Sequence, residues 1–307
     1  MPCKERDAFH TALREFIQES CIGMADRTPK RYRSQILEAG ELLDFKPPLK
    51  ITLPEMRMTE AEIGGNENSR AIKASTFRQF LRWCGNRDAQ RWKLSCKQRP
   101  KEDGVFFGEA QTAYIREFAQ KLGNVHELMY SLGIDNGLRC IDMQRLTPAR
   151  VDRLIRFGKG KILGKGRNGG KEGMLYLNRL TYAPLVQYVQ HRKELVEKYG
   201  YDPEQFLIRE TRHGKPRLIA MNYGDLLEIC NEISKEAKME FDPHDLRRSY
   251  GNRLHLAGKP LETIAKLMRH ESPDEAFKSY IGWFAEEFRA AQDSLCPAES
   301  IQQLTAW

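Results

Sequence analysis

His244 and Arg247 stand three residues apart in the stretch PHDLRRSYGNR, residues 243–253. Pro243 is typical of a first helical turn, and residues spaced by three lie on one face of a helix. A guanidinium presents a rigid fork of donors that matches phosphate oxygens. An imidazole can donate to the same group or transfer a proton near neutral pH. One phosphate would therefore satisfy both side chains.

Four further residues strengthen this interpretation, although a lone HxxR pattern is common by chance. His270 lies in the turn LMRHESPD, and Tyr280 follows ten residues later. Arg139 lies in NGLRCIDMQRLTP at the end of an apolar stretch, and Asp142 follows it by three residues. Asp142 is placed to bind and orient a neighbouring guanidinium or the histidine. Taken alone, Arg139 is as compatible with a partly buried structural arginine as with a functional one.

Residues 159–177, KGKILGKGRNGGKEGMLYL, predict two strands around a glycine-rich turn. Seven basic residues and no acidic one lie between Arg153 and Lys171. Such a hairpin can lie against a nucleic-acid backbone and insert a lysine; the alternative is a basic loop without order. The turn is no nucleotide-binding loop, because Gly170 stands where a Walker A motif needs lysine. We therefore expect no nucleotide cofactor.

The composition fits a folded, highly charged protein. The 307 residues are 40% hydrophobic and 30% charged, with a net charge of +8 and a pI of about 9.1. A basic surplus favours a polyanionic partner, with nucleic acid as the first candidate and a membrane surface as the second. The alternative is that the charge only keeps the protein in solution. The sequence has no apolar run near 18 residues and a polar N-terminus, so we expect no membrane segment and no signal peptide.

Seven cysteines occur, an odd number without a CxxC pair. They predict reduced thiols in a cytoplasmic protein and no zinc or other metal site.

The chain divides at KQRPKEDG, residues 97–104, a polar linker broken by Pro100. Residues 1–100 carry 19 Lys and Arg against 13 Asp and Glu. The sequence predicts a helical N-terminal part, with Thr28 as a helix N-cap and Pro29 at the first helical position. One helical stripe is predicted to be core, and a basic face around it could bind phosphates or be an ordinary solvated face. The stripe comprises Phe77, Phe80, Leu81 and Cys84, and the basic face comprises Arg70, Lys73, Arg78 and Arg82.

The second part mixes helices with a few strands. Gly258 is typical of a helix end, and Pro260 of the start of the next helix. The helical patterns cover residues 110–122, 124–138, 182–200, 222–239, 244–255 and 260–269.

The order and spacing of these motifs resemble those of the tyrosine recombinase (phage integrase) family. The likeness comprises the lead-in FGEAQTAYIREFAQKL, then GLRCIDMQRL, a lysine on a β-hairpin, HDLRRSYGNRLHLAG, LMRHESP and the tyrosine of FKSYIG. It covers residues 105–285, whereas residues 1–96 resemble the family's helical core-binding domain only in character and position. The implied fold is mainly α with a small β-hairpin (α+β), in two domains. The tail at 286–307 is either exchanged between protomers or covers its own core.

The resemblance implies a role for each motif residue. Arg139 and Arg247 would clamp the scissile phosphate, with His244 and His270 beside it. Tyr280 would be the nucleophile, and Tyr250 is the other nearby tyrosine, at a position that the family fills for packing. Asp142 matches the family's acidic residue after the first arginine, and Lys165 matches its hairpin lysine. Other basic residues of the hairpin would bind DNA or compete with Lys165: Lys159, Lys161, Arg167 and Lys171.

Two features depart from the family pattern. The spacing from His270 to Tyr280 is one residue longer than is typical. Met268 and Arg269 replace the familiar leucine and glycine before the second histidine.

The implied activity is site-specific recombination or integration, through a 3′-phosphotyrosine and without ATP, cofactor or metal. The implied partner is double-stranded DNA, held by a homo-tetramer that associates weakly without it, in a cytoplasmic, nucleoid-associated protein. Two alternatives stay open: relaxation of DNA as by a type IB topoisomerase, and a non-catalytic DNA-binding protein of helix-turn-helix type.

Overall fold

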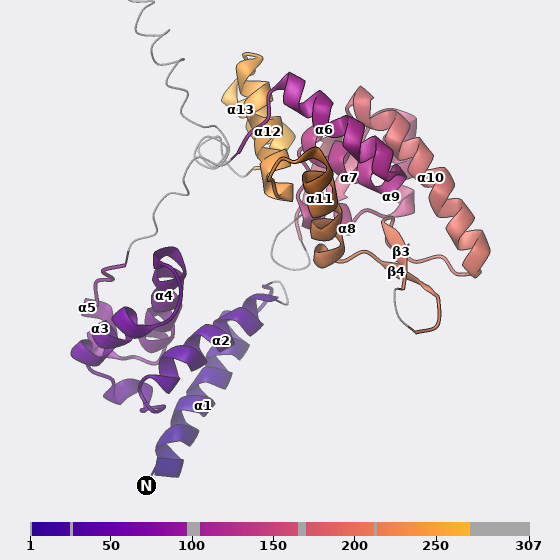
Figure 1. Cartoon of the computed structure of the whole chain (residues 1–307). Helices are drawn as coiled ribbons and strands as arrows, with labels where there is room; N and C mark the ends of the chain where they lie inside the picture. Colours follow the sequence, from indigo (N-terminus) through magenta and orange to yellow (C-terminus); the bar gives the residue numbers. More distant parts are fainter. Residues whose placement is uncertain (1, 25–26, 97–104, 165–169, 212–213, 271–307) are drawn as a thin grey trace, which may run out of the picture. The chain divides into compact units, whose positions relative to one another are not determined.

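The computed structural model describes residues 2–24, 27–96, 105–164, 170–211 and 214–270 of the chain. The chain divides after Glu102 into an N-terminal unit and a C-terminal unit, each described by itself. Helices dominate, with two small antiparallel sheets, so the predicted α+β fold is confirmed (Figure 1). Every described helix is too short or too polar to cross a lipid bilayer. The linker, Lys165, Arg167, Tyr280 and the tail at 286–307 lie outside the described residues.

The N-terminal unit is helical, as predicted. Its core contains the predicted stripe, because Phe77, Phe80 and Leu81 of α4 are fully buried. The rings of Phe9 and Phe16, from α1, meet the Phe80 ring edge-on at centroid distances of 5.4 and 5.5 Å, a favoured aromatic geometry. The helices are α1 (Pro2–Ser20), α2 (Arg27–Glu41), α3 (Leu53–Glu62), α4 (Glu67–Trp83) and α5 (Arg87–Arg91), with a 3₁₀ turn at Pro48–Lys50.

The start of α2 differs from the prediction. The helix begins at Arg27, so Thr28 is inside it and is not the N-cap. Pro29 is the third helical residue instead of the first. Proline is tolerated there because the first four N–H groups of a helix have no partner within the helix.

The C-terminal unit is built around α7 (Asn124–Ile134), whose residues from Leu128 onward are all buried. Helix α7 contacts four other helices, which explains why it is apolar on nearly every side. The surrounding helices are α6 (Glu109–Leu122), α10 (Arg179–Tyr199), α11 (Tyr223–Ala237) and α12 (Pro243–Leu256).

The predicted hairpin is confirmed. Strands β1 (Lys159–Leu163) and β2 (Glu172–Tyr176) pair antiparallel, with Lys159 opposite Tyr176 and Leu163 opposite Glu172. Strand β1 packs on α9 (Pro148–Phe157), and β2 contacts α13 (Leu261–Met268). The hairpin is therefore fixed at its base.

A second small sheet, β3 (Ile208–Glu210) with β4 (Leu218–Ala220), was not predicted. Its strands have three residues each, too few to show an alternating pattern. Tyr188 of α10 holds the first strand, because its hydroxyl accepts from the Ile208 N–H at 2.9 Å and donates to the Ile208 carbonyl at 3.2 Å.

Helix α12 begins at Pro243, as predicted from the sequence. The Asp242 side chain accepts from the backbone N–H groups of His244 and Asp245 at 2.6 and 2.9 Å. Asp245 accepts from the Asp242 N–H at 3.0 Å, which completes a capping box. This start fixes His244 in the first turn and places Arg247 one turn later.

Candidate active site

A turn at the end of α7 forms the floor of the site. Gly137 has a left-handed φ of +59° there, and its N–H donates to the Gly133 carbonyl at 3.0 Å. A Cβ atom on Gly137 would lie 2.4 Å from Cδ1 of Tyr250, so only glycine fits both the backbone and the space. The turn leads to Arg139, which is half-buried and is the N-cap residue of α8 (Cys140–Gln144).

Arg247 lies beneath this turn and is fully buried. Its guanidinium donates to the main-chain carbonyls of Gly137 and Met268. A buried charge needs such partners, and these come from the end of α7 and the end of α13. Arg247 therefore joins segments that are distant in the sequence.

Asp142 binds a guanidinium, and that guanidinium belongs to Arg269. The Asp142 side chain is fully buried, and its Oδ2 lies 3.1 Å from Nη2 of Arg269. The same oxygen accepts from the backbone N–H of Arg139, also at 3.1 Å. The side chain of Arg269 is 8% exposed, and burial lowers its pKa. Sequence reasoning recorded Arg269 only as a departure from the family pattern, so its contact with Asp142 is a new finding.

His270 follows directly and is half-buried, with its backbone N–H bonded to the Ala265 carbonyl at 2.9 Å. Burial lowers the pKa of His270 to about 3, and the cations around it act in the same direction. In order of strength, these cations are Arg247, Arg139, Arg269 and His244. Four of the predicted site residues thus share one electrostatic environment, and it favours an anion.

His244 and Tyr250 lie on the same helix but differ in exposure. His244 is exposed in the first turn of α12, where a helix N-terminus favours anions. Tyr250 is half-buried, its ring packs on Gly137, and burial raises the pKa of its hydroxyl. Tyr250 therefore has the surroundings of a packing residue.

Two arginines bind the hairpin where its strands enter and leave the turn. Arg145 donates to the Gly164 carbonyl at 2.5 Å, and Arg150 pairs with Glu172 at 3.2 Å. Lys161 is exposed and lies 3.6 Å from the same carboxylate. Lys159 and Lys171 are also exposed.

The basic residues of α4 are largely engaged within the N-terminal unit. Lys73 pairs with Glu38 at 2.6 Å. Arg78 donates to the Trp92 carbonyl at 3.1 Å, and exposed Arg82 donates to the Ala89 carbonyl at 2.9 Å. These side chains therefore help to hold α5 and the chain after it, which the sequence did not indicate. Arg70 is half-buried.

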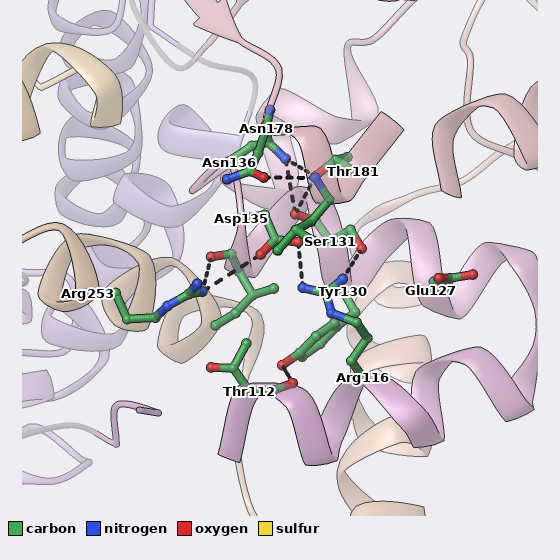
Figure 2. A network of polar contacts seen from close by, with 12 residues as sticks. Thr112, Arg116, Glu127, Tyr130, Ser131, Asp135, Asn136, Asn178, Thr181 and Arg253 are labelled. Carbon is green, nitrogen blue, oxygen red and sulfur yellow. Dashed lines mark hydrogen bonds and ion pairs between the residues drawn. The ribbon is translucent and has the colours of Figure 1, made fainter. Parts of the chain in front are cut away.

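A buried polar network supports the floor of the site from below (Figure 2). Asp135 has no exposed side-chain surface and pairs with Arg116 at 2.7 Å. Arg253 of α12 lies 3.7 Å from its other carboxylate oxygen. Burial raises the pKa of Asp135, and the two arginines oppose this shift. The network fixes the last turn of α7 against α6 and α12, and sequence reasoning missed it.

Asn136 continues this network toward the hairpin (Figure 2). Its side-chain amide donates to the Ser131 carbonyl at 3.1 Å and to the Thr181 hydroxyl. Its oxygen accepts from the backbone N–H of Asn178 at 2.9 Å. The sequence around Asn136 did not indicate these bonds to the start of α10, because they are tertiary contacts.

No group of three or more His, Cys, Asp or Glu side chains within the described residues is arranged to hold a metal ion. The polar side chains of the site that the structure describes are chiefly arginine and histidine. Such groups bind and stabilise an anion by hydrogen bonds and charge.

Comparisons with known proteins identify the family and the fold. The model of the phage integrase family matches residues 106–286. No curated protein matches the sequence. The crystal structure of XerA recombinase is 14% identical, with 95% of this chain and 99% of that chain covered and a TM-score of 0.52.

Two further solved structures share the fold. The Tn1549 transposon integrase in complex with a circular intermediate DNA is 15% identical, with 94% and 99% of the two chains covered and a TM-score of 0.69. A lambda integrase dimer bound to a COC′ core site is 15% identical, with 90% and 79% covered and a TM-score of 0.64. The family model spans more than half of the chain and includes every segment of the site, so this protein belongs to the phage integrase family.

Proposed function

We propose that this protein is a site-specific DNA recombinase that cleaves and rejoins DNA through a covalent 3′-phosphotyrosine at Tyr280. The observation that supports this most directly is the gathering of Arg139, Arg247 and His244 around His270. The transition state for attack on a phosphodiester gathers negative charge on the phosphate oxygens. Positive charge held in partly buried surroundings stabilises it. The described structures of Tn1549 and lambda integrases contain DNA, which supports DNA as the partner.

In the first step, the Tyr280 oxygen forms a bond to phosphorus and the bond from phosphorus to the 5′-oxygen breaks. A phenol with a pKa near 10 is a better leaving group than an alkyl alcohol, so the 5′-hydroxyl of another strand can reverse the step. The number of phosphoester bonds is conserved. The reaction therefore needs neither ATP nor water.

The described residues have separate roles in this scheme. Arg139 and Arg247 stabilise the charge that gathers on the non-bridging oxygens, assisted by His270. His244, exposed at the start of α12, assists removal of the tyrosine proton. Lys165 protonates the leaving 5′-oxygen, with Lys159, Lys161 and Lys171 as rivals for this role.

Charged residues outside the site hold the DNA backbone in this proposal. The hairpin supplies Lys161, Arg167 and Lys171. Helix α4 supplies Arg70, Lys73, Arg78 and Arg82, whose positive charge is partly offset by their contacts within the protein. Four protomers meet on two DNA duplexes, and protomers associate weakly in the absence of DNA.

Covalent trapping tests the function. The wild type, Tyr280→Phe and Tyr250→Phe are incubated with nicked suicide DNA from the genetic neighbourhood of the gene, and the mixtures are denatured. We expect a protein–DNA adduct with the wild type and with Tyr250→Phe, and none with Tyr280→Phe. An adduct that survives in Tyr280→Phe would move the nucleophile elsewhere.

The same samples separate the alternatives. Tight binding without an adduct on any DNA would favour a non-catalytic binding protein. Relaxation of supercoiled plasmid without strand exchange between two sites would favour topoisomerase-like activity. A recombined product from two sites supports the recombinase.

A further inference from the structure

Arg269 has an unusual backbone conformation for an arginine. It ends α13 with φ 56° and ψ 46°, the left-handed region that residues with a Cβ rarely adopt. Glycine would relieve this conformation at no steric cost. A residue persists in such a conformation only where its surroundings hold it, and the bonds of the Arg269 side chain supply such surroundings.

The Arg269 guanidinium makes three hydrogen bonds at 3.1 Å. Nη2 donates to Oδ2 of Asp142 and to the Gly137 carbonyl, and Nη1 donates to the Leu267 carbonyl. The Gly137 carbonyl also accepts from Arg247. The Asp142 oxygen also accepts from the backbone N–H of Arg139. One side chain therefore shares an acceptor with each of the two arginines of the site.

The stem of Arg269 makes a further contact. A Cβ atom placed on Gly173 of β2 would lie 3.0 Å from Cδ and 3.1 Å from Cγ of Arg269. The absence of a side chain at Gly173 thus lets the stem lie directly on the hairpin strand. Strand β2 belongs to the hairpin that carries the candidate lysines.

We propose that Arg269 is a positioning residue, which links the Arg139 turn, to which Arg247 is also bonded, with strand β2, so that both arginines stay directed at the phosphate. This proposal rests on the proposed function. Both arms of the planar guanidinium fork are used, since Nη2 binds Asp142 and the Gly137 carbonyl while Nη1 binds the Leu267 carbonyl, and one lysine nitrogen cannot occupy both positions. Arg269 is assigned no DNA contact in this role, because the bonds that define it, to Asp142, Gly137 and Leu267, lie within the protein.

The first test needs no DNA. Arg269→Gly favours the left-handed backbone and removes the guanidinium, while Lys238→Gly is a matched control at the exposed, left-handed C-cap of α11. Amide hydrogen exchange is measured at Arg139, whose N–H bonds to Asp142. We expect exchange at least about tenfold faster in Arg269→Gly, because a charge-assisted bond that orients Asp142 is lost. The control should leave exchange at Arg139 unchanged.

The second test measures single-turnover cleavage of the suicide DNA, together with DNA affinity. We expect Arg269→Gly to cleave on the order of a hundredfold more slowly, with the Kd changed by less than about threefold. Arg269→Lys should recover part of the rate, and Lys238→Gly should match the wild type. A slower cleavage rate with an unchanged Kd for DNA distinguishes a positioning role from a general weakening of the fold, which would reduce both.

Three results would be decisive. Unchanged exchange and unchanged cleavage in Arg269→Gly would overturn the proposal and leave Arg269 as a helix cap. If Arg269→Gly does not fold, Arg269→Lys decides, since wild-type exchange and rate in that variant contradict the need for a fork. If the wild type forms no Tyr280-dependent adduct, the proposed function fails, whereas the exchange comparison still decides whether Arg269 holds the turn.

Discussion

Arginines bind main-chain carbonyl groups in both units, but in different surroundings. On α4, Arg78 and Arg82 donate to carbonyls at the end of α5, and Arg82 remains exposed. In the C-terminal unit, Arg247 and Arg269 donate to the Gly137 carbonyl, and both side chains are removed from water. The bonds are of one kind, whereas the dielectric surroundings differ.

The difference shows that burial decides how strongly the charge of a bonded arginine acts on its neighbours. An exposed guanidinium that caps a helix is screened by water and salt, so its charge has little effect on its neighbours. A buried guanidinium acts through a medium of low dielectric, and burial of His270, together with the arginines around it, lowers the pKa of His270 to about 3. The charge of the site thus favours an anion, and main-chain carbonyls hold Arg247 and Arg269 in place.

The same conservative substitution in both units gives the largest expected contrast. Arg247→Lys should slow single-turnover cleavage of suicide DNA on the order of a hundredfold to a thousandfold, because a fork of positioned donors is lost. Arg82→Lys, at an exposed position, should leave the cleavage rate of bound DNA within about threefold of the wild type. Equal losses in the two variants would show that burial does not distinguish the two sets of arginines.

Ion pairs give the next contrast, measured as the free energy of unfolding in urea. Asp135→Asn leaves Arg116 and Arg253 around a neutral group and should cost about 3 kcal/mol. Glu38→Gln removes the half-exposed partner of Lys73 and should cost less than about 1 kcal/mol. A larger loss in Glu38→Gln would contradict the expectation that the buried ion pairs of Asp135 stabilise the fold more than the pair of Lys73 and Glu38.

His270 predicts a pH dependence of stability in the C-terminal unit. The unfolded chain protonates this imidazole below about pH 6.5, whereas the folded chain does so near pH 3. The unfolded state therefore binds more protons within this window, and the free energy of unfolding falls as the pH falls through it. His270→Gln should show a smaller fall in thermal unfolding temperature between pH 7 and about pH 4. A parallel decrease in both proteins would exclude this imidazole as the cause.

The smallest expected effect concerns DNA affinity. Arg82→Gln keeps an N–H donor for the Ala89 carbonyl but removes a charge, so the slope of log K against log salt should fall by about one. The cleavage rate of bound DNA should not change. An unaltered slope would remove Arg82 from the surface that binds DNA.

Local sequence patterns predicted much of the fold. Pro243 after Asp242 marks a helix start through chemistry that involves adjacent residues only, and the glycine-rich turn marks the hairpin in the same way. Thr28 and Pro29 carried a weaker signal, because proline is accepted at more than one position of the first turn. The strands of β3 and β4 were too short for any period to be visible.

The sequence named the principal residues of the candidate site, which stay predictions, and did not indicate the residues that support them. Asp142 and Arg269 are 127 residues apart, and Arg253 lies 119 residues from the Ile134 carbonyl that it binds. No spacing rule connects such pairs, because tertiary packing alone brings them together. Arg269 was visible only as a substitution for glycine, which gave no indication of where its side chain lies.

The close approach of Gly137 and Tyr250 has a consequence for the history of the sequence. A methyl group at position 137 would collide with the aromatic ring at 2.4 Å and would strain a left-handed backbone as well. Any lineage that replaces Gly137 therefore has to change residue 250 to a smaller side chain and reshape the turn. The two positions should vary together among homologous sequences, or not at all.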